Sequence, residues 1–537
     1  MWSGHSTTAL LAMLLCVPVS MFLVFAMRPV KGATMAILGS MLLLPERAYF
    51  DIGPIPNLDK FSLPYVAVFL ACCLRCPGRV LRLPRERWMI LIVIGIVVGG
   101  LGTALTNPEA LPSTNGEAIR GLTPRDGVAQ ALRVLLDVVL PLVLGAALFT
   151  KVKEGEELFL AIASAAVLYS VFLLYEARMS PQMHNIVYGY SPIVTWGQTY
   201  RWGGHRPNVF LAHGLALAIF VYVALGCAVT LARRRRPILS LSPGFVSFYL
   251  AAMLGMCRCT ASIIYGVVSL PLWLYASPGT MTRVARVLAL VVLAYPALRV
   301  DVLPPDGLME WLLETAPDRH ESMAFRLRAE DLVLEHVEQK PWFGWGSFGR
   351  NYSPKDPFGI LDGFWIITLG LSGWVGFYNV FLPLVLPVFL TSARLRKFKS
   401  PADRRFLATT SVILVVATVD LLPNGLFTNL VYLLAGALSG ISAGHRASNR
   451  DGFGGGPDPR LWIAALPELF VSERVTQTGG ATRASPSPGP GRRDTSPLEG
   501  PGERSGEPVP EPSPSSDRPR RDTLPITGPA RSSRDET

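Results

Sequence analysis

Residues 8–26 read TALLAMLLCVPVSMFLVFA, an apolar run that contains no charged side chain. A helix needs about 20 such residues to cross the roughly 30 Å hydrocarbon core of a bilayer. The residues before this run lack the basic stretch that opens a secretory signal peptide, so we expect the run to be retained as a membrane span. The start of the chain therefore predicts a membrane helix.

Similar apolar runs recur along the chain between short polar loops. They predict an all-α fold, a polytopic transmembrane helix bundle of about 12–13 spans. The predicted spans are residues 8–26, 30–44, 61–74, 88–104, 134–149, 158–175, 209–231, 241–256, 261–276, 284–298, 364–390, 406–421 and 426–442.

The composition separates the chain into two parts. Charged residues make up 17 % and hydrophobic residues 50 % of the chain, whereas soluble proteins usually contain about 25 % charged residues. The apolar runs end near residue 444, and residues 445–537 are rich in Pro, Ser, Gly and Arg. We expect a transmembrane domain over residues 1–444 and a disordered tail over residues 445–537, because the tail has little apolar surface to bury.

The net charge of +11 does not indicate nucleic-acid binding, because many basic residues flank the apolar runs. Such residues fix topology, since loops rich in Lys and Arg face the cytoplasm. This rule places the loops around residues 233–236 and 394–405 in the cytoplasm, together with the tail. The longer segments 107–133, 178–208 and 300–362 then face the other side, where they indicate chemistry or recognition.

The segment Tyr200-Arg201-Trp202-Gly203-Gly204-His205-Arg206-Pro207-Asn208 precedes one predicted span. Its paired glycines permit a tight turn. Arginines at a membrane boundary offer bidentate donors to phosphate or pyrophosphate. The alternative is an interfacial anchor, because Trp and Arg are common at headgroup level.

The long loop, residues 300–362, contains a predicted helix from Glu321 to about residue 339. Apolar residues recur on it near helical spacing, and it carries Arg326 and Arg328. It can lie flat on the bilayer with both arginines near headgroups, or it can be an ordinary amphipathic surface helix. His336 on this helix is expected to be structural.

After the predicted helix, Pro341 and several glycines indicate a compact loop that carries Trp342 and Trp345. Aromatic residues beside glycines suit contact with a sugar face or with lipid. Asp362 stands where the chain enters the next span, and a carboxylate at that depth is costly unless it is paired or functional. An N-cap role for Asp362 is the competing interpretation.

In this order, the motifs resemble those of the O-antigen ligase and O-antigen polymerase superfamily of polytopic glycosyltransferases. The resemblance covers residues 200–376 by motif and the spans by architecture. The matching residues are Arg201, Gly203, Pro207, Asn208, Arg326, Pro341, Gly344, Gly346, Gly373 and Gly376. The ligases have a histidine at the position of Asp362, and this departure favours a polymerase or a related exopolysaccharide enzyme.

The resemblance implies a glycosyltransferase of the GT-C type at the outer face of the bacterial cytoplasmic membrane, without metal or cofactor. The donor would be a polyprenyl-pyrophosphate-linked glycan, and the acceptor a lipid-linked glycan or a lipid core. Such an enzyme would take part in O-antigen, lipopolysaccharide or exopolysaccharide assembly. The implied catalytic residues are Arg201, Arg326 and Asp362, and the implied substrate-binding residues are Arg206, His205, Asn208, Arg328, Trp342 and Trp345.

Two other functions fit the same spans. A transporter or flippase of lipid-linked saccharides would also present arginines to a phosphate, and it would carry charges inside its spans. The candidates for such charges are Asp137, Glu176 and Asp420. A non-enzymatic scaffold would instead depend on the Arg-rich tail, so deleting that tail would abolish its function and spare glycosyl transfer.

Overall fold

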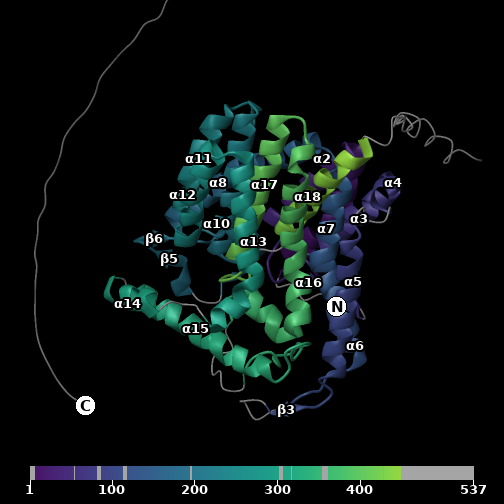
Figure 1. The fold of residues 1–537 in the computed structure, drawn as a ribbon, viewed down its shortest axis with the longest axis vertical. Helices are drawn as coiled ribbons and strands as arrows, with labels where there is room; N and C mark the ends of the chain where they lie inside the picture. Colours follow the sequence, from purple (N-terminus) through teal and green to yellow (C-terminus); the bar gives the residue numbers. More distant parts are fainter. Residues whose placement is uncertain are drawn as a thin grey trace, which may run out of the picture. The chain divides into compact units, whose positions relative to one another are not determined.

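The computed structural model is almost entirely helical (Figure 1). It describes residues 6–53, 55–81, 86–112, 118–193, 196–301, 306–315, 317–353, 361–426 and 429–448. The chain separates into two units, Met1–Gly454 and Gly455–Thr537, and the described residues all belong to the first. The predicted tail after Ser448 therefore lies outside the described residues.

The helices are α1 Thr7–Ala26, α2 Pro29–Leu43, α3 Leu63–Arg75, α4 Pro77–Val80, α5 Trp88–Leu105, α6 Pro124–Val134, α7 Leu140–Leu148, α8 Val152–Met179, α9 Met183–Tyr188, α10 Gly214–Arg233, α11 Pro243–Met256, α12 Thr260–Tyr275, α13 Pro278–Asp301, α14 Asp306–Thr315, α15 Pro317–Glu338, α16 Phe364–Arg394, α17 Pro401–Asp420 and α18 Asn429–Ser448. A π-helical turn, η1 Leu135–Val139, joins α6 to α7, and the short 3-10 turns are η2 Trp196–Thr199 and η3 Leu395–Lys397. Three two-stranded antiparallel hairpins pair β1 Tyr49–Phe50 with β2 Leu58–Asp59, β3 Leu111–Pro112 with β4 Ala118–Ile119, and β5 Tyr200–Arg201 with β6 Gly204–His205.

Every predicted apolar run coincides with a helix, so the all-α prediction is confirmed for the described part of the chain. Among the described residues, seven helical stretches are long and apolar enough to cross a membrane: α1, α5, α6 to α7, α8, α10, α13 and α16 with η3. Five shorter apolar helices, α2, α3, α11, α12 and α18, accompany them. Large apolar side chains on the outer helices are exposed, among them Phe22, Leu91, Val171, Phe248 and Val267, as expected of surfaces that face lipid.

Polar side chains and prolines set where several helices begin. Ser6, Ser242 and Ser400 each accept a hydrogen bond from a backbone N–H in the first turn of the following helix. Thr123 and Asp126 form a reciprocal capping box at the start of α6. These contacts satisfy donors that a helix start leaves unpaired, so short polar residues mark the helix starts.

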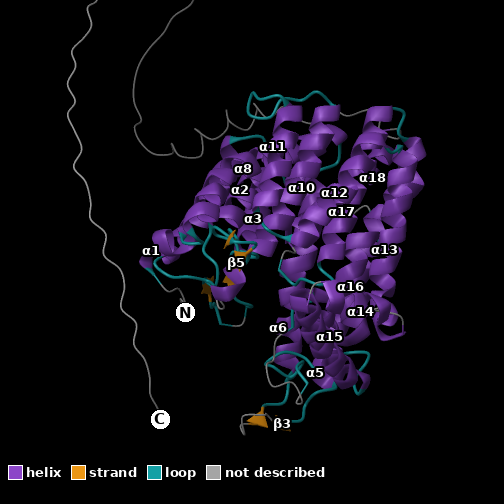
Figure 2. Ribbon diagram, turned by 90° about the vertical axis from the view of Figure 1, so that its left-hand side faces the viewer, coloured by secondary structure: helices purple, strands orange, loops and turns teal. Residues whose placement is uncertain are grey.

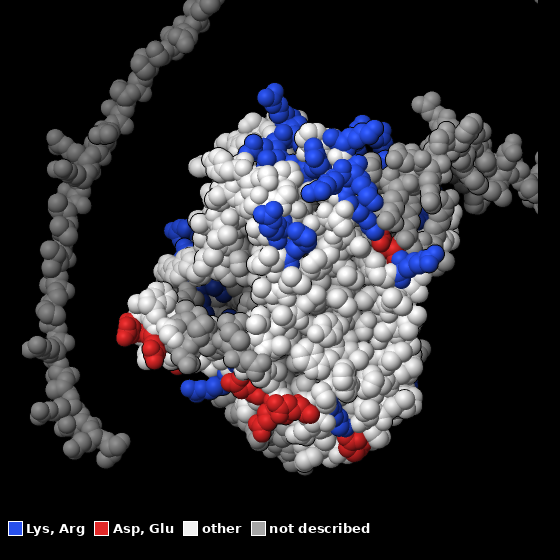
Figure 3. All heavy atoms as spheres, in the orientation of Figure 1, with Lys and Arg blue, Asp and Glu red and all other residues white. Residues whose placement is uncertain are grey.

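The apolar helices lie side by side, and α10 is buried along nearly its whole length between α8, α11, α12 and α17 (Figures 1 and 2). One end of this bundle, which we call the arginine-rich end, gathers most of the visible Lys and Arg residues (Figure 3). It is where α10 ends and α17 begins. The opposite end carries β5, β6, α14 and α15, and we call it the loop end.

The long loop holds two helices rather than the one that was predicted. α15 is longer at its start than expected, and α14 precedes it. Three polar contacts fix α15 to the bundle: Arg299 of α13 pairs with Glu330 at 2.9 Å and with Asp331 at 2.7 Å, and the Trp365 indole donates to Glu330 at 3.3 Å. The buried face of α15 mixes Ala329, Val333 and Val337 with Glu330 and His336, so α15 is a docked helix rather than a simple amphipathic one.

Helix α16 is broken near its start. Gly373 has φ 59° and ψ −159°, a backbone conformation open essentially to glycine alone. The 341–346 loop occupies the break, because Trp374 N donates to Pro341 O at 2.8 Å and Trp345 N donates to Gly370 O at 2.9 Å. The predicted compact loop therefore packs against the helix that carries the predicted glycine pattern at 373–376.

Candidate functional site

The β5–β6 hairpin presents the first predicted motif at the loop end. Tyr200 pairs with His205 and Arg201 with Gly204, and the two residues between them, Trp202 and Gly203, both have positive φ. Positive φ at both central residues is typical of the tightest hairpin turns. The predicted tight turn is therefore present, and it fixes the direction in which the chain leaves Arg201.

Arg258, in the loop between α11 and α12, holds the hairpin in place. Its Nη1 donates to the carbonyl oxygens of Arg201 at 2.8 Å and Trp202 at 3.0 Å. A Cβ atom on Gly204 would lie 2.2 Å from that nitrogen, so a larger residue at this position would push the Arg258 guanidinium out of its present place. Sequence reasoning missed Arg258, and its only signal was a single basic residue between two apolar runs.

The segment after the hairpin is held by Glu176 at the end of α8. The carboxylate accepts from the backbone nitrogens of Asn208 at 2.9 Å, Val209 at 2.7 Å and Met183 at 2.9 Å. Val209 has φ 55°, which is rare for a β-branched residue and persists only where surrounding contacts enforce it. Glu176 is therefore a positioning residue. Asn208 is buried, and its Oδ1 has no hydrogen-bond partner among the described residues.

A cavity of about 230 Å³ lies beside this segment, and we call it the site cavity. Its polar lining includes Arg47, Thr199, Arg206, Asn208 and His213. The side chain of Arg206 also donates to Arg258 O at 3.2 Å. Two arginines therefore line a cavity next to the start of α10, where backbone N–H groups add to the attraction for an anion.

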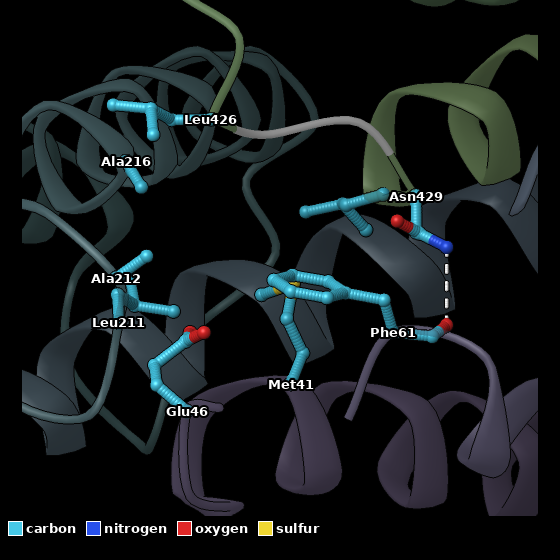
Figure 4. Close-up of a pocket in the computed structure, with 9 residues that line it drawn as sticks. Met41, Glu46, Phe61, Leu211, Ala212, Ala216, Leu426 and Asn429 are labelled. Carbon is cyan, nitrogen blue, oxygen red and sulfur yellow. Dashed lines mark hydrogen bonds between the residues drawn. The ribbon is translucent and has the colours of Figure 1, made fainter. Parts of the chain in front are cut away.

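A second, smaller cavity adjoins the site cavity and shares Ala212 and Leu426 with it. Figure 4 shows the Glu46 carboxylate turned toward this space, with Phe61 and Asn429 across from it. Glu46 is buried and pairs with Lys60 at 2.9 Å, and Lys60 also donates to Phe210 O at 2.7 Å. This buried pair ties the segment that carries Arg47 to the segment that carries Arg206.

His213, the N-cap residue of α10, is surrounded by the charged residues that the motifs predicted. Its pKa is lowered to about 4, chiefly by burial and also by Arg206, Arg326 and Arg201, while Asp362 acts in the opposite direction. Charges act on an imidazole in this way only at short range. Arg206 lines the same cavity as His213, and Arg326 pairs with Asp362. Together with Arg201, these predicted residues from three stretches of sequence lie near enough to His213 to act on its charge, and sequence reasoning missed His213.

The tautomer of His213 follows from its hydrogen bond. The backbone nitrogen of Leu215 donates to Nδ1 at 3.1 Å, so the neutral ring carries its proton on Nε2. A neutral imidazole with a depressed pKa is a poor proton acceptor near pH 7. His213 can instead donate a hydrogen bond from Nε2 to an anionic or hydroxyl oxygen.

Arg326 of α15 pairs with Asp362, which directly precedes α16. Arg326 Nε lies 2.8 Å from Asp362 Oδ2, and both side chains are about two-fifths exposed. The N-cap of α16 is Gly363, so the structure does not give Asp362 the N-cap role that competed with a functional one. A recess near α14 and α15 shows Lys or Arg atoms inside it (Figure 3).

The remaining predicted residues occupy different environments. Arg201 is partly buried, and its Nε has no hydrogen-bond partner among the described residues. The ring of His205 packs edge-on against Tyr200 at 5.6 Å. Arg328 is exposed on α15 and forms no ion pair within the described ranges. Trp342 is 67 % exposed and remains available to a ligand.

Trp345 is buried, and its indole serves the loop itself. The ring stacks on His336 at 4.0 Å, and Nε1 donates to His336 O at 2.7 Å. Lys340 lies 4.6 Å from the centre of the same ring. In this structure Trp345 is a packing residue with no open ring face, contrary to the expectation of substrate contact, and His336 is structural as predicted.

Arg350 completes the support of this loop, and sequence reasoning missed it. Its fully buried guanidinium donates to the carbonyl oxygens of Glu109 at 2.9 Å, Arg120 at 3.1 Å and Trp345 at 3.2 Å. Lys340 Nζ reaches Thr106 O at 2.6 Å. These cations join the loop to the end of α5, so they act in structure and lie outside the cluster around His213.

No group of three metal-ligating side chains occurs in the part of the chain that the structure describes. The cluster around His213 supplies arginines, one carboxylate and one imidazole. Such a set suits binding of a phosphate or pyrophosphate, because guanidinium groups match its oxygens in geometry and charge. No protein-family model matches this sequence, and comparison with curated proteins finds no significant match.

Proposed function

We propose that this protein is a membrane glycosyltransferase of the O-antigen ligase and polymerase type. It polymerises or transfers a polyprenyl-pyrophosphate-linked glycan at the outer face of the bacterial cytoplasmic membrane, in O-antigen or exopolysaccharide assembly. The observation that carries the proposal is the convergence of Arg201, Arg206, Arg326 and Asp362 on His213. Independent motifs that predict one site and then meet in space support a common function.

The chemistry follows from the charges. An acceptor hydroxyl oxygen attacks the anomeric carbon, the bond from that carbon to the pyrophosphate oxygen breaks, and the pyrophosphate leaves on its lipid. Arg201, Arg206 and Arg326 bind the developing negative charge on the leaving group. The hydroxyl proton passes to a base, for which Asp362 is the candidate, and such a base contributes roughly 10²–10⁴-fold.

His213 has the complementary role. Its Nε2 proton can donate to a phosphate or sugar oxygen, and its low pKa keeps it neutral near pH 7. A neutral donor binds an oxygen without competing with Asp362 for the hydroxyl proton. This division of roles resembles that of other active sites in which the environment separates the pKa values of neighbouring groups.

Reconstituted transfer tests the proposal. The full chain is purified into vesicles and supplied with a polyprenyl-pyrophosphate-linked oligosaccharide. We expect product from the wild type and a loss of about 10²-fold or more in the Arg201→Ala and Arg326→Ala variants. Arg120→Ala, which removes an arginine that pairs with Asp126 outside the candidate site, is the control and should retain activity.

The products separate the two members of the proposed class. A ladder of lengthened lipid-linked glycan indicates a polymerase, whereas a conjugate on an added lipid core indicates a ligase. Full activity in well-folded Arg201→Ala and Arg326→Ala variants would refute the assigned roles. Absence of both products across several donors, with intact protein, would count against glycosyl transfer itself.

The carboxylates that a flippase would use inside its spans all have partners. Asp137 pairs with Arg133 at 2.6 Å, and Asp420 accepts from Asn424 at 3.1 Å. Glu176 accepts three backbone N–H groups. Partners of this kind favour structural roles for Glu176 and Asp420, which supports the enzyme over the transporter. Asp137 keeps one buried oxygen, Oδ1, without a hydrogen-bond partner among the described residues.

A further inference from the structure

A small cavity lies at the arginine-rich end of the bundle, far along α10 from the site cavity. It has a volume of about 40 Å³ and is lined by residues of α10, α12 and α17, including Arg233, Trp273 and Arg405. About 10–15 Å³ suffices for one water molecule. The space can therefore admit more than one polar oxygen atom.

Two arginines flank this cavity, and each donates one hydrogen bond to a backbone carbonyl group at the end of α12. Arg405 donates to Trp273 O at 3.2 Å, and Arg233 donates to Leu274 O. A helix end leaves its last carbonyl groups unpaired, so both contacts act as C-terminal caps. A guanidinium has five N–H donors, and most of them remain available on both arginines.

The charge of these two arginines is not compensated in the described ranges. Neither Arg233 nor Arg405 forms an ion pair there. A third arginine, Arg234, also lines the cavity, but it pairs with Glu156 and with Asp403, the latter at 2.6 Å. Two cations that line one small cavity without a carboxylate create a site for an added anion.

Trp273 provides a second, independent observation. Its side chain is 1 % exposed and lines the cavity, yet its indole Nε1 is buried without a hydrogen-bond partner among the described residues. A buried indole N–H usually has a partner, and leaving it unpaired costs free energy. An oxygen atom in the cavity is a natural acceptor for it.

The depth of the cavity indicates the source of that oxygen. Arg233 ends a helix long and apolar enough to span a membrane. Tyr275, next to Leu274, is 83 % exposed, and exposed aromatic residues at span ends mark the headgroup layer. The cavity therefore opens where lipid phosphates lie.

We infer that Arg233, Arg405 and Trp273 form a binding site for the phosphate of an anionic phospholipid headgroup. A phosphate oxygen accepts from the Trp273 indole while the two guanidinium groups neutralise the charge. The site is separate from the cluster around His213, so it stands or falls independently of glycosyl transfer.

Lipid titration of the full chain in detergent tests this site. Thermal unfolding is followed while dioleoyl-phosphatidylglycerol or dioleoyl-phosphatidylcholine is added, and the shift in midpoint gives an apparent affinity for each lipid. We expect phosphatidylglycerol to stabilise the wild type more than phosphatidylcholine. Each basic residue near an anionic surface contributes a factor of about five to the affinity. The affinity for phosphatidylglycerol should therefore fall about fivefold in Arg405→Gln and about thirtyfold in the double variant Arg233→Gln/Arg405→Gln.

Arg235→Gln is the matched control, because Arg235 belongs to the same basic run and does not line the cavity. It should leave phosphatidylglycerol binding unchanged, and an equal loss in this variant would show general surface attraction and overturn the site. Trp273→Phe keeps the ring and removes the N–H that the phosphate oxygen accepts, so it should lower the affinity for phosphatidylglycerol. An unchanged affinity for phosphatidylglycerol in Trp273→Phe and in the double variant would refute the inference.

Inorganic phosphate provides the last arm of the experiment. If the lipid is the ligand, millimolar phosphate should neither stabilise the protein nor displace phosphatidylglycerol. Equal stabilisation by free phosphate would assign the cavity to a soluble anion and overturn the lipid site. If the arginine variants do not fold, Arg233→Lys and Arg405→Lys keep the charge and still lose the forked donor geometry.

Discussion

A Cβ atom on Gly344 would lie 2.6 Å from the backbone nitrogen of Gly373. The 341–346 loop therefore fits onto the broken helix α16 only because both positions are glycine. The same contact fixes the first turns of α16, which begin directly after Asp362. The two glycine motifs thus position a carboxylate of the candidate site without touching it.

The first prediction concerns this contact. Gly373→Ala places a Cβ atom 2.4 Å from Pro341 O and forces an unfavourable φ. Strain of this kind costs about 1–3 kcal/mol, so the midpoint of thermal unfolding and the transfer activity should both fall. Gly39→Ala is the control, because nothing lies within 4 Å of its added Cβ and alanine favours a helix. Equal stability of both variants would contradict the proposed fit.

The second prediction separates stability from activity in the Arg326–Asp362 pair. Both side chains are partly exposed, so a double-mutant cycle of Arg326→Gln and Asp362→Asn should give a coupling of at most about 1 kcal/mol in unfolding. Transfer activity should fall about 10²-fold or more in each variant. Arg120→Gln breaks a comparable exposed pair with Asp126 outside the site and should leave the activity unchanged.

The third prediction concerns the hairpin support. Gly204→Ala drives a Cβ atom into the Arg258 guanidinium, and Arg258→Gln removes its two bonds to the turn. Both changes should misplace Arg201 and raise the KM for the lipid-linked donor about tenfold, while the protein stays folded. Gly197→Ala, whose Cβ would meet no atom within 4 Å, tests whether any added methyl group nearby has this effect.

The fourth prediction is a pH dependence of stability. His213 has a pKa of about 4 in the folded protein, below its ordinary value of 6.5. The unfolded chain therefore binds more protons between these values, so stability is complete above pH 6.5 and falls as the pH is lowered toward 4. His184, whose pKa burial also lowers to about 4, acts in the same window.

His213→Asn isolates the contribution of His213, because the asparagine Oδ1 can take the place of Nδ1 and still cap α10. The slope of unfolding free energy against pH is set by the number of protons taken up on unfolding. Between pH 6.5 and 4 this number should be smaller by about one in the variant. An unchanged slope would mean that His213 is not buried among the arginines as described.

The apolar runs predicted the helices well because burial in lipid leaves a backbone little choice but to form helices. The predicted run that starts at residue 209 shows where this fails. Its helix begins only at Gly214, because Glu176 captures the backbone N–H groups of Asn208 and Val209. That capture is a tertiary contact from another helix, and no local pattern reveals it.

The candidate site was partly predictable for a similar reason. Arg326 stood out as a charge on the predicted helix of the long loop and Asp362 as a carboxylate at the entry to a predicted span, and the structure pairs them. Arg258 and His213 did not stand out, because their roles depend on which loops meet at one end of the bundle. The prediction that Trp345 contacts substrate failed because the position of an aromatic residue beside glycines does not reveal whether its ring is exposed. In the structure, His336 covers the ring.

The ion pair between Arg326 and Asp362 also changes the free energy that an arriving phosphate gains by binding Arg326. Arg326 is already neutralised, so a pyrophosphate that binds it exchanges one anionic partner for another. The net free energy of capture is then smaller than that of a bare guanidinium, and the carboxylate is set free as the donor settles. Under the proposed function, Asp362 holds the acceptor proton after transfer; once it has passed this proton to water it can pair with Arg326 again, and that pairing favours release of the spent lipid carrier.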